Sequence, residues 1–126
     1  MRVLYVDDDR INALLFIEAC RFAPGVEVET AYSGSEALAC VEGWAPDLLV
    51  IDLHLPDTTG YALLPVLRAR MGGLPRPAFL CTADEAPLVA APARAAGFDG
   101  LWTKPVDLRL VLQELEHRSA ARGAAR

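Results

Sequence analysis

The sequence lacks the features that mark several large protein classes. It has only three cysteines (Cys20, Cys40 and Cys81) among 126 residues. They stand far apart among apolar neighbours, so neither a disulfide framework nor a cysteine metal site is predicted. No apolar run approaches the ~20 residues that a membrane-spanning helix needs. The first apolar run, residues 3–6, ends at once in acidic residues, unlike a signal peptide. We therefore expect a cytoplasmic protein with reduced, buried thiols.

Basic charge is also scarce. The chain has 12 Lys and Arg residues against 17 Asp and Glu residues, which gives a formal net charge of -5. An acidic chain gains little from the counterion release that drives binding to nucleic acid, and anionic lipid repels it. We therefore expect no direct binding of nucleic acid and no membrane association.

Hydrophobic residues are abundant, at 53%, and the length suits one domain with a buried core. Apolar runs at residues 3–6, 48–51 and 78–81 are typical of strands buried on both faces of a parallel sheet. Residues 26–31 alternate between apolar and polar, and residues 100–103 form a short run. These two segments are predicted to be the edge strands.

Segments with a helical period lie between the predicted strands. Asp9, Ser33 and Asp107 are expected to cap three of these helices, Ser33 as part of a capping box with Glu36. Each helix should turn one apolar stripe towards the sheet. The predicted stripes are Ile11, Leu14, Leu15 and Phe22; Ala37, Leu38 and Val41; Leu63, Leu64, Leu67 and Met71; and Leu108, Val111, Leu112 and Leu115.

Five strand–helix units of this length predict one α/β fold, because right-handed crossovers leave few other arrangements. We expect a doubly wound sandwich in which a parallel five-stranded sheet has the order 2-1-3-4-5. In such sheets the functional groups gather beyond the carboxyl ends of the strands.

Polar residues stand at those strand ends. Asp7 and Asp8 follow the first strand, Asp52 ends the third, Thr82 ends the fourth and Lys104 follows the fifth. Clustered carboxylates repel one another unless a hard cation lies among their oxygens, and Mg²⁺ suits an all-oxygen site. A carboxylate can then attack phosphorus. Each residue alone has an ordinary explanation as a cap or surface group, but the combination predicts phosphoryl chemistry.

Four stretches of the chain, residues 4–9, 47–60, 81–83 and 103–105, resemble the motifs of response regulator receiver domains in two-component signalling. The resemblance extends over nearly the whole chain. It implies a flavodoxin-like (βα)5 fold, with residues 1–118 as the receiver domain and residues 119–126 as a frayed tail or the start of a linker.

The resemblance also implies roles for individual residues. In the family the phosphoacceptor aspartate helps to bind Mg²⁺, together with an acidic pair and one backbone carbonyl, while a hydroxyl and a lysine contact the phosphoryl group. The matching residues are Asp52 as the phosphoacceptor; Asp7, Asp8, Asp52 and the backbone carbonyl of His54 as the Mg²⁺ ligands; and Thr82 and Lys104 as the signalling hydroxyl and the phosphate-binding lysine.

Partners follow from the same resemblance. A histidine kinase or a histidine phosphotransfer protein is expected to supply the phosphoryl group. A downstream protein target or a fused output domain is expected to receive the signal, and a phosphorylation-dependent dimer is allowed. The chain would be a signalling domain rather than an enzyme, catalysing only its own phosphorylation and dephosphorylation.

The sequence departs from the family pattern in the regions that transmit the signal. Leu101 stands where the family usually has an aromatic ring, and Trp102 beside it should lie on the other face of the strand. Pro65 is expected to kink the third helix, and Pro87 and Pro92 are expected to shorten or kink the fourth. Signal transmission by movement of an aromatic side chain at this position, which is usual in the family, is therefore in question.

Two further positions border the expected phosphoryl group. His54 and Asp84 stand two residues after Asp52 and Thr82. For Asp84 we favour a cap on the fourth helix over a role in orienting water. The family also leads us to expect a cis bond before Pro105.

Two other functions fit part of the pattern. A haloacid-dehalogenase-like phosphatase would use Asp7 as its nucleophile in the Asp-x-Asp motif formed with Asp9, but the chain is short for one. A pseudo-receiver that only binds partners is the second alternative. It would not respond to a phosphodonor.

Overall fold

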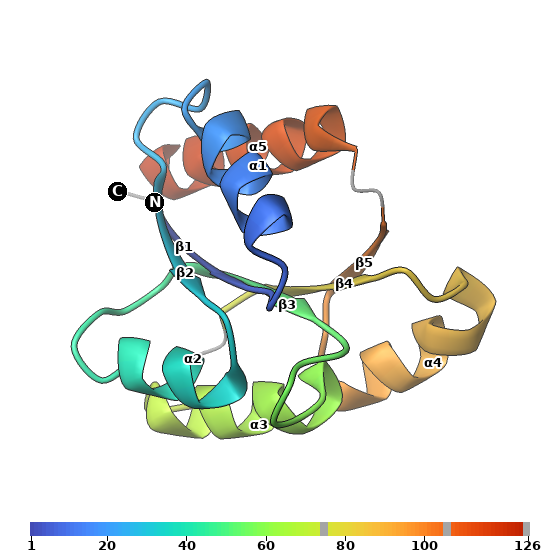
Figure 1. Ribbon diagram of the computed structural model, residues 1–126. Coiled ribbons are helices and arrows are strands. Elements are labelled where there is room, and N and C mark those ends of the chain that lie inside the picture. The colour runs from blue at the N-terminus through green and yellow to red at the C-terminus, as the bar shows by residue number, and fades with distance from the viewer. Residues whose placement is uncertain (74–75, 105–106, 125–126) are drawn as a thin grey trace.

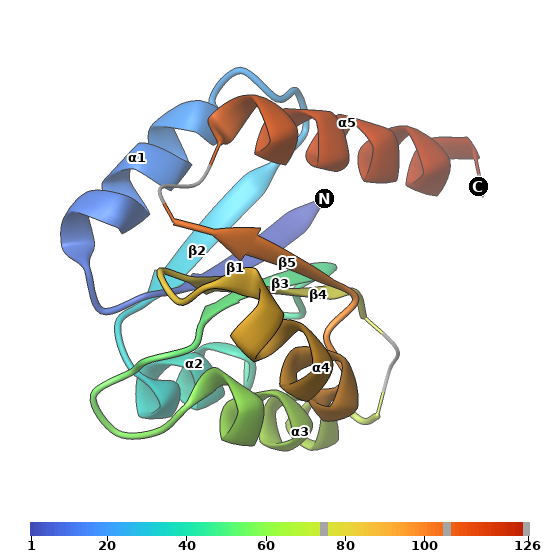
Figure 2. The ribbon, with the colours of Figure 1, turned by 90° about the vertical axis from the view of Figure 1, so that its right-hand side faces the viewer.

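Five strands and five helices alternate along the chain in a computed structural model that describes residues 1–73, 76–104 and 107–124. Helices α1 and α5 cover one face of the sheet, and α2, α3 and α4 cover the other (Figures 1 and 2). In chain order the elements are β1 (Arg2–Val6), α1 (Arg10–Cys20), β2 (Glu27–Ala31), α2 (Gly34–Cys40), β3 (Leu48–Asp52), α3 (Gly60–Arg70), β4 (Ala78–Thr82), α4 (Ala86–Ala96), β5 (Gly100–Thr103) and α5 (Leu108–Ala124).

The sheet is parallel and has the order β2-β1-β3-β4-β5, which confirms the predicted topology. Its register pairs Val6 with Ile51, Asp52 with Cys81 and Thr82 with Thr103. The carboxyl ends of β1, β3, β4 and β5 therefore meet at one edge.

The burial of the strands follows the sequence pattern. Every residue of β3 and β4 is buried, whereas β2 alternates at its edge position. Along β3, Leu49 and Ile51 pack in the core beneath α2, α3 and α4, while Leu48 and Val50 pack beneath α1 and α5. Burying each such side chain stabilises the fold by about 1.5–3 kcal/mol, so the central strands form a rigid base for the site.

Three of the four predicted caps are confirmed. Asp9 and Ser33 accept hydrogen bonds from backbone N–H groups in the first turns of α1 and α2. Asp107 does the same for α5. Three of the four predicted apolar stripes also face the sheet: Ala37 in α2, Leu64 in α3 and Leu115 in α5 are fully enclosed. Leu38, Met71 and Leu112 are partly buried, and the side chain of Leu108 lies outside the described part of the chain.

The stripe predicted for α1 is wrong. The helix buries Ala13 and Phe16 instead, because the ring of Phe16 stacks on Tyr5 with centroids 4.4 Å apart. The helix is apolar around most of its circumference, so the period alone does not select the buried face. The exposed fractions of the predicted residues are 70% for Ile11, 58% for Leu14, 51% for Leu15 and 78% for Phe22, which lies beyond the end of the helix.

The prolines do not interrupt their helices. Helix α4 is continuous over 11 residues, with Pro87 in its first turn, where a missing N–H costs little. Pro92 in α4 and Pro65 in α3 are exposed. The predicted cap on α4 is wrong: its N-cap is Glu85, without a side-chain bond, and Asp84 pairs elsewhere.

The last element of the described chain is α5. Helix α5 continues through residues 119–124, and the domain limit at residue 118 stays a prediction. The expected cis bond before Pro105 lies outside the described residues. Within the described part of the chain, no helix combines the length and apolarity that crossing a membrane requires.

Candidate functional site

Three carboxylates meet at the carboxyl edge of the sheet. Oxygens of Asp7, Asp8 and Asp52 all lie within 4.8 Å of one another. Asp7 follows the last residue of β1, and Asp52 is the last residue of β3, so the parallel register of the two strands brings them together. Asp7 and Asp52 are buried, at 1% and 6% exposed, and Asp8 is exposed. The structure therefore brings the three predicted carboxylates into one cluster.

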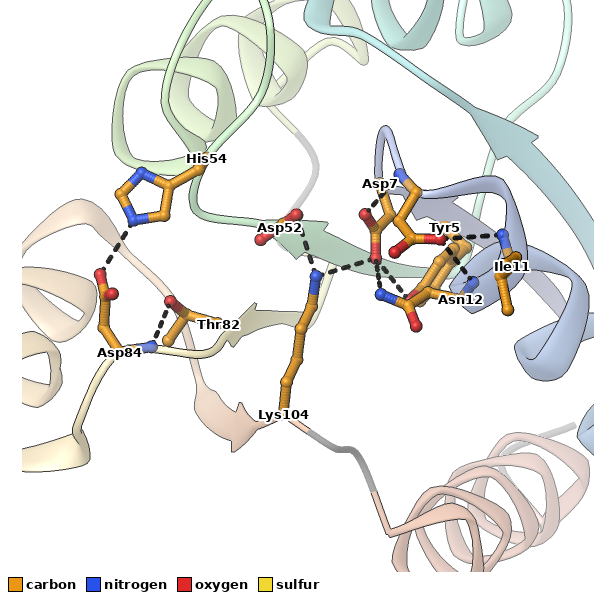
Figure 3. A network of polar contacts seen from close by, with 10 residues as sticks. Tyr5, Asp7, Ile11, Asn12, Asp52, His54, Thr82, Asp84 and Lys104 are labelled. Atoms are coloured by element: carbon orange, nitrogen blue, oxygen red, sulfur yellow. Dashed lines mark hydrogen bonds and ion pairs between the residues drawn. The ribbon is translucent and has the colours of Figure 1, made fainter.

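Hydrogen bonds fix the carboxylate of Asp7. The Tyr5 hydroxyl donates to its Oδ2 at 3.0 Å, and the backbone N–H of Asp9 donates to its Oδ1 at 3.0 Å. Asn12 Nδ2 adds a longer contact of 3.4 Å to Oδ2 (Figure 3). Burial, the largest cause, raises the pKa of Tyr5, as do nearby charges, so Tyr5 remains a neutral donor.

Lys104 joins two of the carboxylates. Its Nζ lies 3.1 Å from Asp7 Oδ2 and 3.1 Å from Asp52 Oδ2 (Figure 3). The backbone N–H of Lys104 donates to the carbonyl of Thr82, which places the residue directly beyond the end of β5. One cation thus offsets part of the repulsion between two buried acids.

The surroundings of Asp52 change the pKa of its carboxyl group. Burial raises the pKa of Asp52 to about 6, the negative charge of Asp7 acts in the same direction, and Lys104 opposes both. At neutral pH the carboxylate is still mostly ionised. The raised pKa shows that its negative charge is costly in this setting, and a bound cation would lower that cost.

Thr82 and the pair His54–Asp84 border the same edge. Thr82 is fully buried, and its Oγ1 accepts a hydrogen bond from the backbone N–H of Asp84 at 3.1 Å. His54 Nε2 and Asp84 Oδ2 lie 2.9 Å apart, linking the loop after β3 to the loop after β4 (Figure 3). Because Thr82 accepts the N–H, its own proton is available to another acceptor.

The donor set fits a hard divalent cation. The clustered ligand atoms are all carboxylate oxygens, which is the chemistry that Mg²⁺ prefers. Among the described residues no cysteine joins the cluster, and the ring of His54 is engaged by Asp84. A contribution from the backbone carbonyl of His54 stays a prediction.

Sequence reasoning missed several supporting residues. Tyr5 lies two residues before Asp7 on the same strand face, so alternation could have predicted their contact. Asp57 carried no such signal: its carboxylate accepts the backbone N–H groups of Gly34 and Ser35 at the start of α2, more than 20 residues away in the sequence. These bonds lower the pKa of Asp57, and they tie the loop after β3 to α2.

Comparison with known proteins agrees with this geometry. Residues 3–116 match the response regulator receiver domain family. The chain is 36% identical over 113 residues to the probable transcriptional regulatory protein TcrX of Mycobacterium tuberculosis, covering 90% of this chain and 47% of that protein. It is 32% identical over 109 residues to protein-glutamate methylesterase/protein-glutamine glutaminase 2 of Anaeromyxobacter dehalogenans, covering 86% and 29%.

A solved structure matches over the entire length. The CheY-like response regulator receiver domain protein of Methanospirillum hungatei superimposes with a TM-score of 0.82 and 27% identity, covering 99% of this chain and 98% of that one. The chain thus matches a whole receiver domain, but less than half of the length of the two curated relatives.

Proposed function

Because this chain belongs to the response regulator receiver domain family of two-component signalling, we propose that it accepts a phosphoryl group on Asp52 and passes the signal on through altered protein contacts. The observation that carries the proposal is the buried Asp52 carboxylate, which shares one strand-end cluster with two more carboxylates and the Lys104 ammonium group.

Asp52 is the proposed nucleophile. One of its oxygens forms a bond to phosphorus while the bond from phosphorus to the donor's histidine nitrogen breaks. The electron pair of that bond stays on the imidazole, which takes up a proton. With a pKa of about 6, Asp52 is mostly ionised at neutral pH and can attack.

Lys104 and Thr82 are proposed to bind the transferred group. Lys104 Nζ already contacts Asp52 Oδ2, so it lies close to any group attached to that carboxylate. The Thr82 hydroxyl has its proton free of the bond with Asp84 and can donate it to a phosphoryl oxygen. Both interactions strengthen as negative charge accumulates on the phosphoryl oxygens.

The metal site is proposed to be formed by Asp7, Asp8, Asp52 and the backbone carbonyl of His54. Mg²⁺ bound there would supply positive charge that offsets the charge of the phosphoryl oxygens. Tyr5 and the N–H of Asp9 hold Asp7 in a fixed orientation for this role.

A small phosphodonor tests the proposal without a partner protein. Acetyl phosphate with Mg²⁺ should add one phosphoryl group per chain, detected by mass spectrometry, and Asp52→Asn should abolish the addition. Glu42→Gln, which removes an exposed carboxylate outside the cluster, should be labelled like the unsubstituted protein. Labelling that persists in Asp52→Asn would contradict the assignment of Asp52 as the phosphoacceptor. A protein that no phosphodonor labels would be a pseudo-receiver.

The phosphoryl donor is proposed to be a histidine kinase or a histidine phosphotransfer protein. Helix α1 begins three residues after Asp7, and its exposed residues include Ile11, Leu14 and Leu15 in its first two turns. An exposed apolar face next to a polar site is typical of a protein interface. We infer that the donor docks on this face and presents its phosphohistidine to Asp52.

The signal is proposed to leave by a route without the usual aromatic residue. Leu101 packs in the core beneath α4, whereas Trp102 lies on the other face and stacks on Phe79 with centroids 4.7 Å apart. The expected face of Trp102 is thus confirmed, and this ring does not substitute for the missing one. The relatives named above are regulators or enzymes much longer than this chain, so either a separate target or an output domain in the same polypeptide would receive the signal.

A further inference from the structure

The loop between β3 and α3 is a narrow hairpin. At its base His54 and Thr59 form an antiparallel bridge, and nearer the tip the backbone N–H of Leu55 donates to the carbonyl of Thr58 at 3.2 Å. His54, whose backbone carbonyl is a proposed Mg²⁺ ligand, stands three residues before Asp57 at the tip. Because these backbone contacts join the two arms, a shift of the tip should also move the backbone of His54.

Both carboxylate oxygens of Asp57 bind the start of α2. Oδ1 accepts the backbone N–H of Gly34 at 2.8 Å, and Oδ2 accepts that of Ser35 at 2.9 Å. The first N–H groups of a helix have no partners within the helix, and a cap residue beside them usually accepts one of them. In α2 the cap Ser33 accepts the N–H of Glu36. The two N–H groups before it are therefore satisfied by a carboxylate from a distant loop.

Glycine at position 34 allows the loop to approach the helix this closely. A Cβ atom at this position would lie 2.6 Å from Thr58 Cγ2 and 3.2 Å from Asp57 Oδ1. The first distance is too short for two carbon atoms, so any side chain here would displace the loop. Gly34 is buried in this contact, and the hairpin tip and the start of α2 fit directly against each other.

The hairpin is also tied on its other side, to the loop after β4. His54 Nε2 lies 2.9 Å from Asp84 Oδ2 (Figure 3). The two side chains are 67% and 42% exposed, and an exposed pair of this kind adds little to stability. Asp57 instead binds two backbone N–H groups whose positions the helix fixes, and such charge-assisted bonds are the stronger kind. The contact with α2 is therefore the main restraint on the tip of the hairpin.

We propose that Asp57 is a positioning residue for the metal site, because it restrains the loop that supplies the His54 carbonyl. The inference rests on the proposed function, since it needs Mg²⁺ to bind among Asp7, Asp8 and Asp52. Mg²⁺ demands a nearly ideal octahedron of oxygen ligands, so a displaced ligand lowers its affinity. Groups that orient a ligand without touching the metal typically change the affinity by about 10- to 100-fold.

Calorimetric titration of the full chain with Mg²⁺ tests the proposal from both sides of the contact. Asp57→Ala removes the two acceptors, whereas Gly34→Ala keeps the carboxylate and its charge but blocks the close approach. Each should weaken Mg²⁺ binding about tenfold or more. Asp57→Asn keeps one carbonyl acceptor for a backbone N–H, so it should restore part of the affinity that Asp57→Ala loses.

Two controls separate positioning from the stability of α2. Ser33→Ala removes the cap of the same helix but leaves the bonds of Asp57 in place, so it should lower the Tm without changing the Kd for Mg²⁺. Gly43→Ala adds a methyl group shortly after α2, where no described atom beyond the chain neighbours lies within 4 Å, and should change neither value. Without Mg²⁺, the Leu55 amide should exchange its hydrogen about fivefold faster or more in Asp57→Ala and Gly34→Ala than in Ser33→Ala.

Asp8→Asn in the same titration distinguishes failure of this inference from failure of the proposed metal site. Binding that is lost in Asp8→Asn but unchanged in Asp57→Ala and Gly34→Ala would overturn the positioning role alone. Equal losses of affinity in Ser33→Ala and Asp57→Ala would also overturn it, because the stability of α2 would then explain both. Binding that persists in Asp8→Asn would overturn the proposed metal site and this inference with it.

Discussion

At the scale of single residues, the cost of charge on Asp52 is the central physical fact. Burial and the neighbouring Asp7 raise its pKa, and Lys104 only partly compensates. A carboxylate held at such a cost gains from a bound cation, because the cation offsets its negative charge. The free-energy cost of the ionised Asp52 carboxylate should also make the folded state less stable in the absence of a metal ion.

This cost predicts a pH-dependent stabilisation by Asp52→Asn. A pKa raised from 3.8 to about 6 means that the native state prefers the protonated acid. The contribution of Asp52 to stability is therefore fully present below about pH 4 and is lost as pH rises through about 6. Without Mg²⁺, Asp52→Asn should raise the free energy of unfolding by on the order of 2 kcal/mol at pH 7.5 and by little at pH 4.

Urea unfolding at the two pH values measures the effect. Glu42→Gln removes an exposed acid and should change little at either pH. A gain for Asp52→Asn that is equal at pH 4 and pH 7.5 would argue against the raised pKa.

Tyr5 is predicted to position a metal ligand. Its hydroxyl fixes the Asp7 carboxylate from a buried position, so Tyr5→Phe should weaken Mg²⁺ binding about fivefold while lowering stability by about 1 kcal/mol. Tyr32→Phe, on a ring outside the cluster, is the control. Fluorescence or calorimetric titration with Mg²⁺ measures the affinity, and equal affinities in the two variants would show that Tyr5 has no such role.

The sequence predicted the residues of the candidate site better than the residues that hold the surrounding loops in place. Asp7, Asp8, Asp52, Thr82 and Lys104 all follow from one rule, because parallel strands deliver their final residues to one edge. The partnership of Asp57 with the start of α2 depends on how a loop folds back across the sheet. Nothing in the local sequence encodes that approach.

At the scale of elements, α1 shows where pattern reasoning fails. Apolar residues surround most of this helix, so several faces satisfy a helical period. In the structure α1 is turned so that Phe16 stacks on Tyr5 and Asn12 contacts Asp7, and the predicted face is left exposed. Both are tertiary contacts. The larger aliphatic side chains are consequently left exposed, which is the basis for the proposed docking face.

The docking face predicts a selective defect. Leu14→Asp places a charge on an exposed position, 58% accessible, so the fold should be retained. Transfer from a cognate phosphohistidine donor should fall about tenfold or more in kcat/KM, because a charge would be buried in an apolar interface. Labelling by acetyl phosphate should be unchanged.

Leu88→Asp on α4 is the matched control, since Leu88 is also exposed, at 71%, but lies on another helix. Stopped-flow or phosphate-affinity gel assays with both donors measure the effect. Equal losses for the two variants, or a loss with acetyl phosphate as well, would contradict docking on α1.

At the scale of the whole molecule, the order of the sheet was predictable because three fully apolar strands need a buried place and two others suit the edges. The length of α4 was not predictable in this way, because a proline in the first turn and an exposed proline further along are both compatible with a helix.

The acidic cluster couples metal binding to global stability. Mg²⁺ should bind the folded cluster and not the unfolded chain, so at ten times its Kd it should raise the Tm by about 5 °C, and EDTA should reverse the rise. Asp8→Asn should remove most of the increase without lowering the metal-free Tm, because Asp8 is exposed and repelled by its neighbours. Differential scanning calorimetry measures both values. An increase that persists in Asp8→Asn would place the metal elsewhere.

The position of the phosphoryl group tests the account most directly. After reaction with acetyl phosphate and Mg²⁺, borohydride converts an aspartyl phosphate to homoserine, which peptide mass spectrometry locates in the sequence. Homoserine at position 52, and at no other aspartate, is the predicted result. Homoserine at position 7 would instead indicate the phosphatase-like nucleophile and contradict the assignment of Asp52 as the phosphoacceptor.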